Sequence, residues 1–471
     1  MKKHLKTVGW VFVLMILIAL IGAAIRINFD ENSVYGDVVI SLLIIQVQVF
    51  AFIFALYVLP VYFIRKRWKK NKLKSAGKKW WDSQTSKSVA KFILNGSAMF
   101  GALTIFYAFL VAIFAHFISP DNSPNANDQI NEIAYQPPGF EITLIKQPLT
   151  LQSPDKGFFS TLLYGKKSAY KLIPVNNYAF SGDSLVIERF IGTGMKGETA
   201  AFELSSITGE NISADENRKL VRDKFISHRK FIFGTDDLGR DYLSRIILGI
   251  RISLSVGFVA VLIALFIGIP VGAISGFYKA APPQIKIPKR SRGYLRLPVD
   301  DFIMWLMNVI WAIPTLLLVF PIVFAFGQHY YTIFIAVGLT MWVDISRIVR
   351  GQVMQIRELE FVQAAKTFAY SDMRTIFRHI LPNIAGPVIV ITAANFAYAI
   401  LTEAGLSFLG IGVQPPAPSW GFMISKYKDN LITNPYLPLI PGFAITLLVL
   451  AFFMIGNGLR DALDVKTKIE H

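Results

Sequence analysis

Residues 361–382 read FVQAAKTFAYSDMRTIFRHILP, a polar stretch between two strongly apolar segments. Apolar residues recur within it at helical spacing, in two series separated by a break, which predicts two short amphipathic helices. We expect Ser371 to cap the second helix and Pro382 to end it. A hairpin of this size cannot bury both stripes on itself, so at least one should face another surface. The stripes are Phe361, Ala364, Ala365 and Phe368, then Met373, Ile376, Phe377, Ile380 and Leu381.

The pattern alone leaves open whether this hairpin binds a partner or only links two spans along a membrane surface. Composition indicates that such spans exist. The chain has 471 residues, of which 53% are hydrophobic, and its mean hydropathy is +0.47. It has no cysteine, which excludes a disulfide framework, a thiolate metal site and a cysteine nucleophile.

The apolar residues are gathered into blocks long enough to cross a bilayer. We therefore predict an all-α polytopic membrane protein with about eight transmembrane helices. We interpret the first block as an uncleaved anchor rather than a signal peptide, because it continues without a clear cleavage site and another block follows closely. The blocks are 7–25, 38–64, 92–118, 252–277, 302–326, 330–346, 387–404 and 437–455.

The basic residues predict the orientation of these spans. Residues 65–79 carry nine Lys or Arg and no acidic residue, and the connector 278–297 is also basic. The positive-inside rule places both segments, and both termini, in the cytoplasm. Orientation thus accounts for the net charge of +17, which in a soluble chain would suggest nucleic acid. Binding of anionic lipid by residues 65–79 is the alternative.

Residues 119–227 are the only long polar segment. Alternating stretches at 141–146 and 184–190 predict short strands between Gly, Pro and Asn turns. We expect a small β-rich extracytoplasmic insert of roughly 100 residues. Two roles are open for it: a collar on which another protein docks, or a decoration without transport function. Its nearly balanced charge argues against lipid or nucleic acid as its partner.

Residues 234–254 are rich in charge and lead into the fourth span. Gly234-Thr-Asp-Asp-Leu-Gly-Arg-Asp241 is followed by Leu243-Ser-Arg245 and Gly249-Ile-Arg-Ile-Ser-Leu254. We expect an interlocked turn that caps the span, in preference to direct contact with a substrate. In that turn Asp236, Asp237 and Asp241 are available to Arg240, Arg245 and Arg251.

Residues 361–382 resemble the cytoplasmic coupling loop of binding-protein-dependent ABC importer permeases. Its pattern is Glu-Ala-Ala, three residues, Gly, nine residues, Ile, one residue, Leu-Pro. Gln363, Ala369 and His379 depart from it, the last as in the FxHxLPN variant of the peptide branch. In that family the loop docks in a cleft of the ATPase subunit. The resemblance implies that the ATPase-coupling residues are Gln363, Ala364, Ala365, Phe368, Ala369, Asp372, Arg374, His379 and Pro382. Among these, Ala364, Ala365, Phe368 and His379 are expected to make the contact itself.

Three further segments resemble the C-type subunits of dipeptide, oligopeptide and nickel importers. Residues 234–254 resemble GTDxLGRDxxSRxxxGxRxSL, residues 406–421 resemble LSFLGLGxQPPxPSWG, and residues 458–464 resemble a GLRDALD terminus. The resemblance covers about 92–466 without the insert, and the first two spans have no counterpart in the family's six-span core. It implies an outer structural signature of Gly234, Asp236, Asp237, Gly239, Arg240, Asp241, Arg245 and Arg251.

The resemblance also implies the organisation and the partners. Residues 1–91 are then two extra spans with a basic loop, 92–118 the first core span, 119–227 the insert and 228–471 the rest of the core. The chain would be half of a peptide translocation pathway in a bacterial cytoplasmic (inner) membrane, and no enzyme. It would bind no cofactor, metal or nucleic acid. Its partners would be membrane lipid, a homologous second permease, two ATPase subunits that use ATP and Mg, and an extracytoplasmic substrate-binding protein.

Other interpretations remain open. Nickel or another small solute is an alternative cargo, although no His-rich or carboxylate-rich outer cluster favours a metal over peptides. A membrane-embedded sensor or enzyme with an outer ligand domain would need ionisable residues at mid-membrane, and an ion-coupled carrier would need inverted repeats with charged midplane sites. We find only Glu403 near the outer end of span seven and Asp344 at the inner edge of span six, and interpret both as packing or interface residues.

Overall fold

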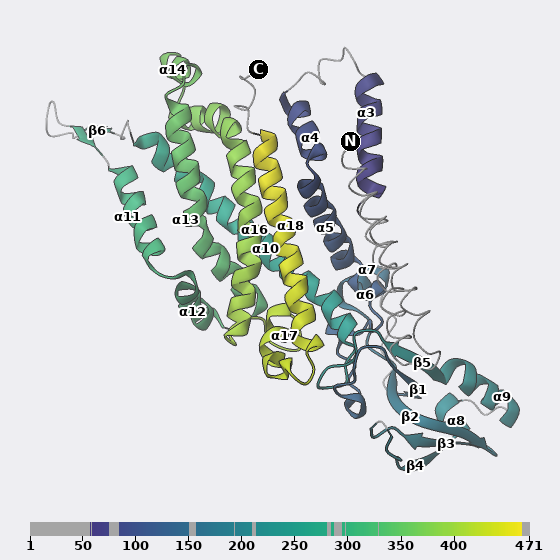
Figure 1. The fold of residues 1–471 in the computed structure, drawn as a ribbon. Helices are drawn as coiled ribbons and strands as arrows, with labels where there is room; N and C mark the ends of the chain where they lie inside the picture. The colour runs from purple at the N-terminus through teal and green to yellow at the C-terminus, as the bar shows by residue number, and fades with distance from the viewer. Residues whose placement is uncertain are drawn as a thin grey trace, which may run out of the picture. The chain divides into compact units, whose positions relative to one another are not determined.

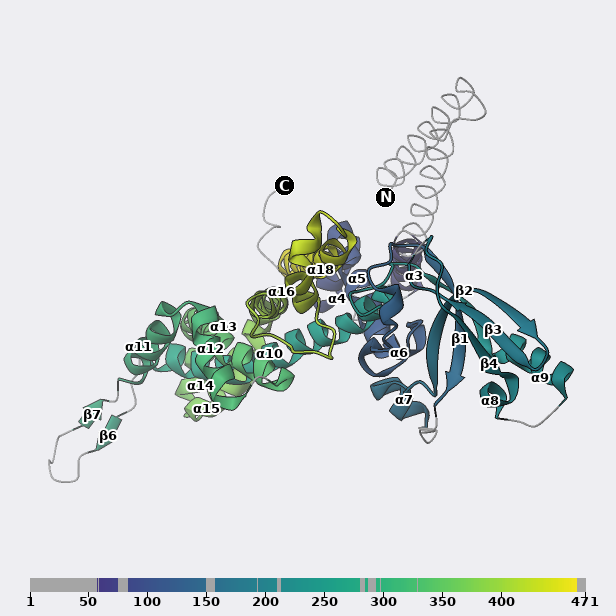
Figure 2. The same cartoon turned by 90° about the horizontal axis from the view of Figure 1, so that it is seen from below.

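The computed structural model describes residues 57, 59–74, 84–149, 157–192, 194–209, 213–279, 284–286, 294–296, 298–327 and 329–463. The first predicted span, most of the second, residues 75–79 of the basic segment and the chain from Asp464 onward lie outside these residues. The chain divides into two units, residues 1–103 and 104–471 (Figures 1 and 2).

The described part of the first unit contains α3 (Leu59–Lys74), α4 (Gln84–Leu94) and the start of α5. The basic segment is therefore helical up to Lys74 rather than a loop, because Lys and Arg are good helix formers and no Gly or Pro interrupts it there. Arg65 donates hydrogen bonds to the carbonyls of Ile93 (3.1 Å) and Leu94 (3.0 Å). These bonds satisfy the last carbonyls of α4, which have no partner within that helix.

The predicted span 92–118 is interrupted rather than continuous. Helix α5 (Gly96–Ile113) is separated from α4 by Asn95, and the short α6 (Ala115–Ile118) follows it. The Asn95 side-chain oxygen accepts from the backbone N–H groups of Ser97 (3.1 Å) and Ala98 (3.2 Å). Asn95 therefore acts as an N-cap, the role in which Asn is strongly preferred.

Residues 119–231 hold a five-stranded antiparallel sheet in the order β4-β3-β2-β1-β5. The predicted strands at 141–146 and 184–190 are confirmed as β1 and β3, and β5 carries the sheet past the expected end at residue 227. One face packs against α8 (Leu204–Thr208) and the turn η4 (Val221–Phe225). The strands are β1 (Phe140–Pro148), β2 (Tyr170–Ser181), β3 (Ser184–Arg189), β4 (Thr199–Glu203) and β5 (Ile226–Phe231).

Long helices form the rest of the second unit. Five helices of the described residues are long and apolar enough to cross a membrane: α5, α10, α13, the run Asp372–Phe408 that ends in α16, and α18. A sixth candidate, α11 with α12, is bent by 91°. Span five is thus not one continuous helix, because Ile313 is extended and Pro314 follows it. The bounds are α10 (Tyr242–Tyr278), α11 (Val299–Ala312), α12 (Thr315–Phe326), α13 (Tyr330–Arg357), α16 (Ala385–Phe408) and α18 (Tyr436–Leu463).

Helices α10 and α13 approach each other closely along a stripe of glycines. A Cβ atom on Gly272 would lie 2.4 Å from the Ser346 carbonyl oxygen, and one on Gly276 would lie 2.6 Å from that of Arg350. Ser346 also donates its hydroxyl to the Gly268 carbonyl at 3.0 Å. Small residues at four-residue spacing allow this approach between membrane helices. The α10–α13 pair carries much of the main hydrophobic core.

Short elements connect the long ones. The basic connector after α10 contains a two-stranded ribbon of β6 (Gln284–Lys286) and β7 (Tyr294–Arg296). A hairpin with α14 (Glu360–Thr367) joins α13 to α16, and α17 (Trp420–Tyr427) lies between α16 and α18. Figure 1 shows α14 and α17 at opposite ends of the helices in the second unit.

Candidate functional site

The predicted helical hairpin is present. Helix α14 is followed by α15 (Asp372–Thr375), and the chain stays helical through η5 (Ile376–Ile380) and η6 (Leu381–Ile384) into α16. Ser371 caps α15, as predicted, since its hydroxyl accepts from the Arg374 N–H. The prediction that Pro382 ends the second helix is wrong. Leu381 keeps helical angles and begins a new helical turn, and Pro382 is the second residue of that turn, where its missing N–H costs little.

The turn between α14 and α15 depends on a left-handed residue. The N–H of Ala369 donates to the Lys366 carbonyl (2.9 Å), and that of Tyr370 donates to the Ala365 carbonyl (3.2 Å). These two bonds form a Schellman motif, in which the residue after the C-cap is left-handed and usually glycine. Here that residue is Ala369, with φ of 55°. The family that this loop resembles has glycine at this position. Ala369 therefore keeps the left-handed turn at the cost of some backbone strain.

One face of the hairpin packs against its own chain. Val362, Ile376, Ile380 and Ile384 join the core that α10 and α13 form. Ala365 belongs to this face as well and is only 3% exposed. The expectation that Ala365 contacts a partner is therefore wrong. The helical repeat placed it on the predicted stripe, but α14 turns that edge of the stripe inward.

The opposite face of the hairpin is apolar and uncovered. Phe368 is 74% exposed and Phe377 is 59% exposed. Phe361, Ala364 and Met373 are exposed on the same hairpin. We call these five residues, Phe361, Ala364, Phe368, Met373 and Phe377, the aromatic face.

Polar contacts hold the hairpin on the helices below it. Gln363 donates its side-chain amide to the Arg357 carbonyl (3.1 Å), and Asp372 accepts from the Tyr278 hydroxyl (3.1 Å). Arg357 in turn donates to the Phe277 carbonyl at 2.6 Å. Gln363 and Asp372 therefore position the hairpin, and neither is part of the aromatic face.

Cations and rings pack together beside this anchor. Arg357 lies 5.2 Å from the Phe277 ring centre, and Lys366 lies at the same distance from the same ring. Burial, reinforced by the Arg357 charge, lowers the pKa of Lys366.

A second ring stack lies across the turn of the hairpin. The guanidinium of Arg374 lies 4.4 Å from the centre of the Tyr370 ring, and His379 stacks on the same ring at 5.8 Å. His379 Nε2 is buried without a partner among the described residues. Of the predicted coupling residues, Arg374 and His379 thus rigidify the turn, while Pro382 is exposed beside it.

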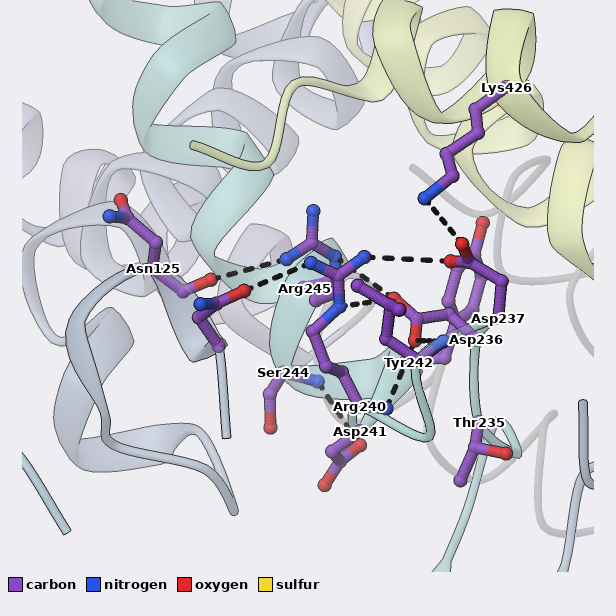
Figure 3. Close-up of polar contacts among 12 residues, drawn as sticks. Asn125, Thr235, Asp236, Asp237, Arg240, Asp241, Tyr242, Ser244, Arg245 and Lys426 are labelled. Atoms are coloured by element: carbon purple, nitrogen blue, oxygen red, sulfur yellow. Dashed lines mark hydrogen bonds and ion pairs between the residues drawn. The ribbon is translucent and has the colours of Figure 1, made fainter. Parts of the chain in front are cut away.

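At the α17 end of the second unit, the predicted interlocked turn is centred on Asp236 (Figure 3). This side chain is 0% exposed. One oxygen accepts from the N–H groups of Leu238 (2.9 Å) and Arg240 (3.0 Å), and the other accepts from Arg240 Nε at 2.7 Å. Arg245 Nε lies 3.5 Å from that second oxygen. Both expected partners of Asp236 are confirmed, and we call this set with its contacts the Asp236 network.

Asp237 and Asp241 use partners that the sequence did not indicate. Asp237 lies 3.6 Å from Arg240, but its closer partners are Lys426 (2.7 Å) and the Tyr427 hydroxyl (2.5 Å) on α17. Burial opposes ionisation of Asp237, yet the bonds from Lys426 and Tyr427 outweigh it and hold its pKa below the ordinary value.

Asp241 has a double role. It caps α10 by accepting from the Ser244 N–H, and its other oxygen accepts from Arg229 of β5 at 2.9 Å. The network therefore joins the sheet, the start of α10 and α17. Spacing along the sequence could not reveal Arg229, Lys426 or Tyr427, because these contacts depend on how distant segments pack.

Two glycines of the predicted signature fit positions that exclude a side chain. Gly234 has φ of 72° and Gly239 has φ of 68°. A Cβ on Gly239 would lie 1.8 Å from the Ile130 carbonyl oxygen, and one on Gly234 would lie 2.3 Å from that of Gln136. The turn is therefore packed directly against the segment that leads to β1.

Arg251 lies outside the Asp236 network, so its predicted pairing is wrong. It donates to the Leu163 carbonyl at 3.1 Å and lies nearly two turns of α10 beyond Arg245. Burial and the positive charge of Arg251 lower the pKa of His116 on α6. Asp128 lies in the segment between α6 and β1. Burial and the negative charge of Asp121 raise the pKa of Asp128 to about 6.

A further ion-pair cluster, centred on Asp300, was not predicted from the sequence. Asp300 of α11 accepts two bonds from Arg350 of α13, at 2.7 and 2.8 Å, and one from the Ser275 hydroxyl of α10. Lys279 lies 3.4 Å away. The acidic residue at the start of α11 and the basic connector are visible in the sequence, but their pairing is not.

The two acidic residues noted within spans differ in setting. Glu403 is fully buried, and one of its oxygens accepts from the hydroxyls of Ser407 (2.7 Å) and Ser419 (2.6 Å). Asp344 is exposed and lies at the middle of α13, which extends to Arg357. Helix α13 continues past residue 346, where span six was expected to end, as far as Arg357, so Asp344 does not lie at the end of the helix.

These features define a multi-pass membrane protein with an anchored helical hairpin at one end. A family model for the inner membrane component of binding-protein-dependent transport systems matches residues 293–469. The dipeptide transport system permease protein DppC of Alkalihalophilus pseudofirmus is 42% identical over 236 residues, which are 50% of this chain and 72% of that protein. The oligopeptide transport system permease protein OppC of Bacillus subtilis is 39% identical over the same shares.

The chain therefore belongs to the binding-protein-dependent transport system inner membrane components. Among solved structures, the inward-facing MetNI methionine ABC transporter matches with a TM-score of 0.38 at 15% identity, over 47% of this chain and 96% of that one.

Proposed function

We propose that this chain is the permease subunit of an ABC importer for peptides and forms half of its translocation pathway. The related permeases named for dipeptide and oligopeptide transport support peptides as the cargo. ATP and Mg would be used by two separate ATPase subunits. A second permease would complete the pathway, and an extracytoplasmic binding protein would deliver the peptide.

The observation that carries this proposal is the aromatic face of the 361–382 hairpin. Five apolar residues are exposed there, although the hairpin itself is fixed by Gln363, Asp372 and a buried stripe. An exposed apolar patch on a rigid element is typical of a protein interface, and aromatic residues dominate the binding energy of such interfaces. We infer that the ATPase subunit covers this face and that movement of the ATPases is passed on through it.

Substitution of the aromatic face tests the docking. Phe368→Asp or Phe377→Asp should reduce co-purification of the ATPase at least tenfold, about 1.4 kcal/mol of binding free energy. The matched control is Ile432→Asp, because Ile432 is 93% exposed but lies between α17 and α18. Normal ATPase recovery with Phe368→Asp and Phe377→Asp would refute the docking site. Ala365→Arg would not test the docking site, because Ala365 packs against its own chain and an arginine there would disturb the hairpin itself.

The proposed topology has eight spans, the two N-terminal ones included, in the bacterial inner membrane. The termini, the basic segments and the hairpin are then cytoplasmic, and the five-stranded sheet is extracytoplasmic. In support, the hairpin and α17 lie at opposite ends of the helices in Figure 1, and the sheet is tied to the α17 end through Arg229–Asp241.

The sheet would then lie where a binding protein must dock, and we propose that it forms a docking collar. Attaching a bulky polyethylene-glycol maleimide to Ser206→Cys, an exposed site on α8, tests this without disturbing the fold. The label should reduce ATP hydrolysis stimulated by the binding protein and leave basal hydrolysis unchanged, compared with the same variant unlabelled. If the labelled variant kept full stimulation of ATP hydrolysis by the binding protein, the sheet would have no role in docking.

A further inference from the structure

Asp344 and Arg347 lie one turn apart inside α13. Asp344 comes fourteen residues after Tyr330 and thirteen before Arg357. At 1.5 Å per residue, α13 is about 42 Å long, which exceeds the hydrocarbon core by about 12 Å. If α13 crosses the whole core and all of this excess projects beyond Arg357, Asp344 lies about 7.5 Å inside the core and Arg347 about 3 Å inside.

The positive charge of Arg347 acts on Asp344, but within the part of the chain that the structure describes neither residue forms a salt bridge of 4 Å or less. Asp344 is exposed, and its hydrogen-bonding neighbour is the side chain of Trp311. Arg347 donates to the side-chain oxygen of Asn308 at 2.8 Å and lies 4.4 Å from the centre of the Trp311 ring. Its Nε is buried without a partner. Asn308 and Trp311 of α11 thus hold the guanidinium in place without supplying an anion.

The surroundings exclude lipid on this side of α13. A charged residue inside the bilayer core faces a protein interior or water, because lipid cannot solvate it. Directly after Trp311 the helix breaks, with Ile313 extended and 40% exposed, and α12 leaves at 91°. Such an irregular backbone at membrane depth is tolerated only against protein or along a water-filled cavity. The two charges on α13 and the helix break at Ile313 therefore indicate independently that this face is in contact with water or with a partner protein.

We infer that Asp344 and Arg347 form a binding site for a zwitterionic peptide within the translocation pathway, an inference that rests on the proposed function. Asp344 receives the peptide's ammonium group, and Arg347 receives its carboxylate, the anion that a planar guanidinium binds in a bidentate way. Side chains three residues apart on a helix are about 5–6 Å apart at Cβ. An extended dipeptide spans at most about 7 Å, so both ends can be held at once.

Thiol labelling tests whether this face is wet, since the chain has no cysteine of its own. Ile348→Cys places a thiol four residues from Asp344 on the same face. Leu339→Cys is the matched control, because Ile348 and Leu339 are both 37% exposed but Leu339 lies about 180° around the helix from Ile348 and about 140° from Asp344. In the assembled complex without nucleotide, a charged methanethiosulfonate reagent should label position 348 at least tenfold faster than position 339. No labelling at 348 would mean that a partner covers the face, and would overturn the site.

Protection by defined probes tests the chemistry. Dialanine at millimolar concentration should slow labelling at position 348, whereas N-acetyl-dialanine amide, which has the same backbone without charged ends, should not. Adding Asp344→Asn or Arg347→Gln should abolish protection, while Asp344→Glu should keep part of it. Equal protection by both probes, or protection that survives both neutral substitutions, would refute the inference.

Failure of this site can be told apart from failure of the proposed function. Peptide uptake by the unmodified complex, with ATP hydrolysis stimulated by its binding protein, tests the function itself. If uptake occurs but dialanine gives no protection, only the Asp344–Arg347 site is wrong. If the unmodified complex takes up no peptide, the proposed function fails regardless of labelling.

Discussion

Asp236 and Arg240 form an ion pair of 2.7 Å in which the two side chains are 0% and 5% exposed. Glu141 and Lys230 form a pair with the same distance on the sheet, but their side chains are 65% and 61% exposed. The two pairs have the same distance and differ in how far their side chains are exposed to water. They therefore allow the effect of burial to be measured within one protein.

We predict that Asp236→Asn destabilises the folded protein by about 3–5 kcal/mol, because it removes the counter-charge of the buried Arg240 and Arg245. The single oxygen of Asn also cannot accept from both the two backbone N–H groups and Arg240 Nε. Glu141→Gln should cost no more than about 1 kcal/mol, since water screens an exposed pair. Thermal unfolding of the purified variants measures the difference. Equal losses would show that burial of the Asp236 pair does not matter.

Ala369 offers a test of backbone strain. A left-handed conformation costs an L-residue about 1–2 kcal/mol, and glycine avoids most of this cost. Ala369→Gly should therefore stabilise the protein by up to about 1 kcal/mol. Ala364→Gly is the control, because residue 364 is exposed in the middle of α14, where glycine should cost about 0.5–1 kcal/mol. Destabilisation by both changes in chemical denaturation would contradict the role given to Ala369.

The same hairpin shows what could be predicted from the sequence. Helical spacing predicted both of its helices, and local hydrogen-bonding chemistry predicted the Ser371 cap. Spacing could not decide which edge of the stripe would be buried, so Ala365 was assigned to the wrong face. Which edge is buried depends on where α10 and α13 leave space for a side chain, and the sequence of α14 alone does not determine that.

The Asp236 network has a similar limit. Charges close in sequence correctly predicted the pairing of Asp236 with Arg240 and Arg245. Arg229 and Lys426 come from β5 and α17, and no local pattern places them beside Asp241 and Asp237.

Asp128 should make the stability depend on pH. Burial and Asp121 raise its folded pKa to about 6, above the ordinary value of 3.8. Between these values the folded state holds a proton that the unfolded state has lost, so this group's contribution to stability falls as pH rises from about 4 to about 6. In Asp128→Asn the contribution disappears. The melting temperature of the variant should therefore rise relative to the unmodified protein as pH increases through this window.

The control for this measurement is Asp215→Asn, because the Asp215 side chain is 94% exposed. Its melting curve should run parallel to that of the unmodified protein across the window. If the Asp128→Asn curve ran parallel as well, the carboxyl of Asp128 would not titrate near pH 6 in the folded protein, and the effect of its burial would be overestimated.

The orientation of the chain can be measured with the same cysteine-free background. Ser206 on α8 and Thr367 at the end of α14 are both exposed, so a single cysteine at either position should react readily wherever reagent can reach it. In intact cells, with the outer membrane made permeable where one is present, a membrane-impermeant maleimide should label Ser206→Cys and spare Thr367→Cys. Opening the inner membrane should make the two rates similar, which controls for intrinsic reactivity. Labelling of Thr367→Cys in sealed cells would place the hairpin outside, where no ATPase could bind it, and would overturn both the topology and the docking proposal.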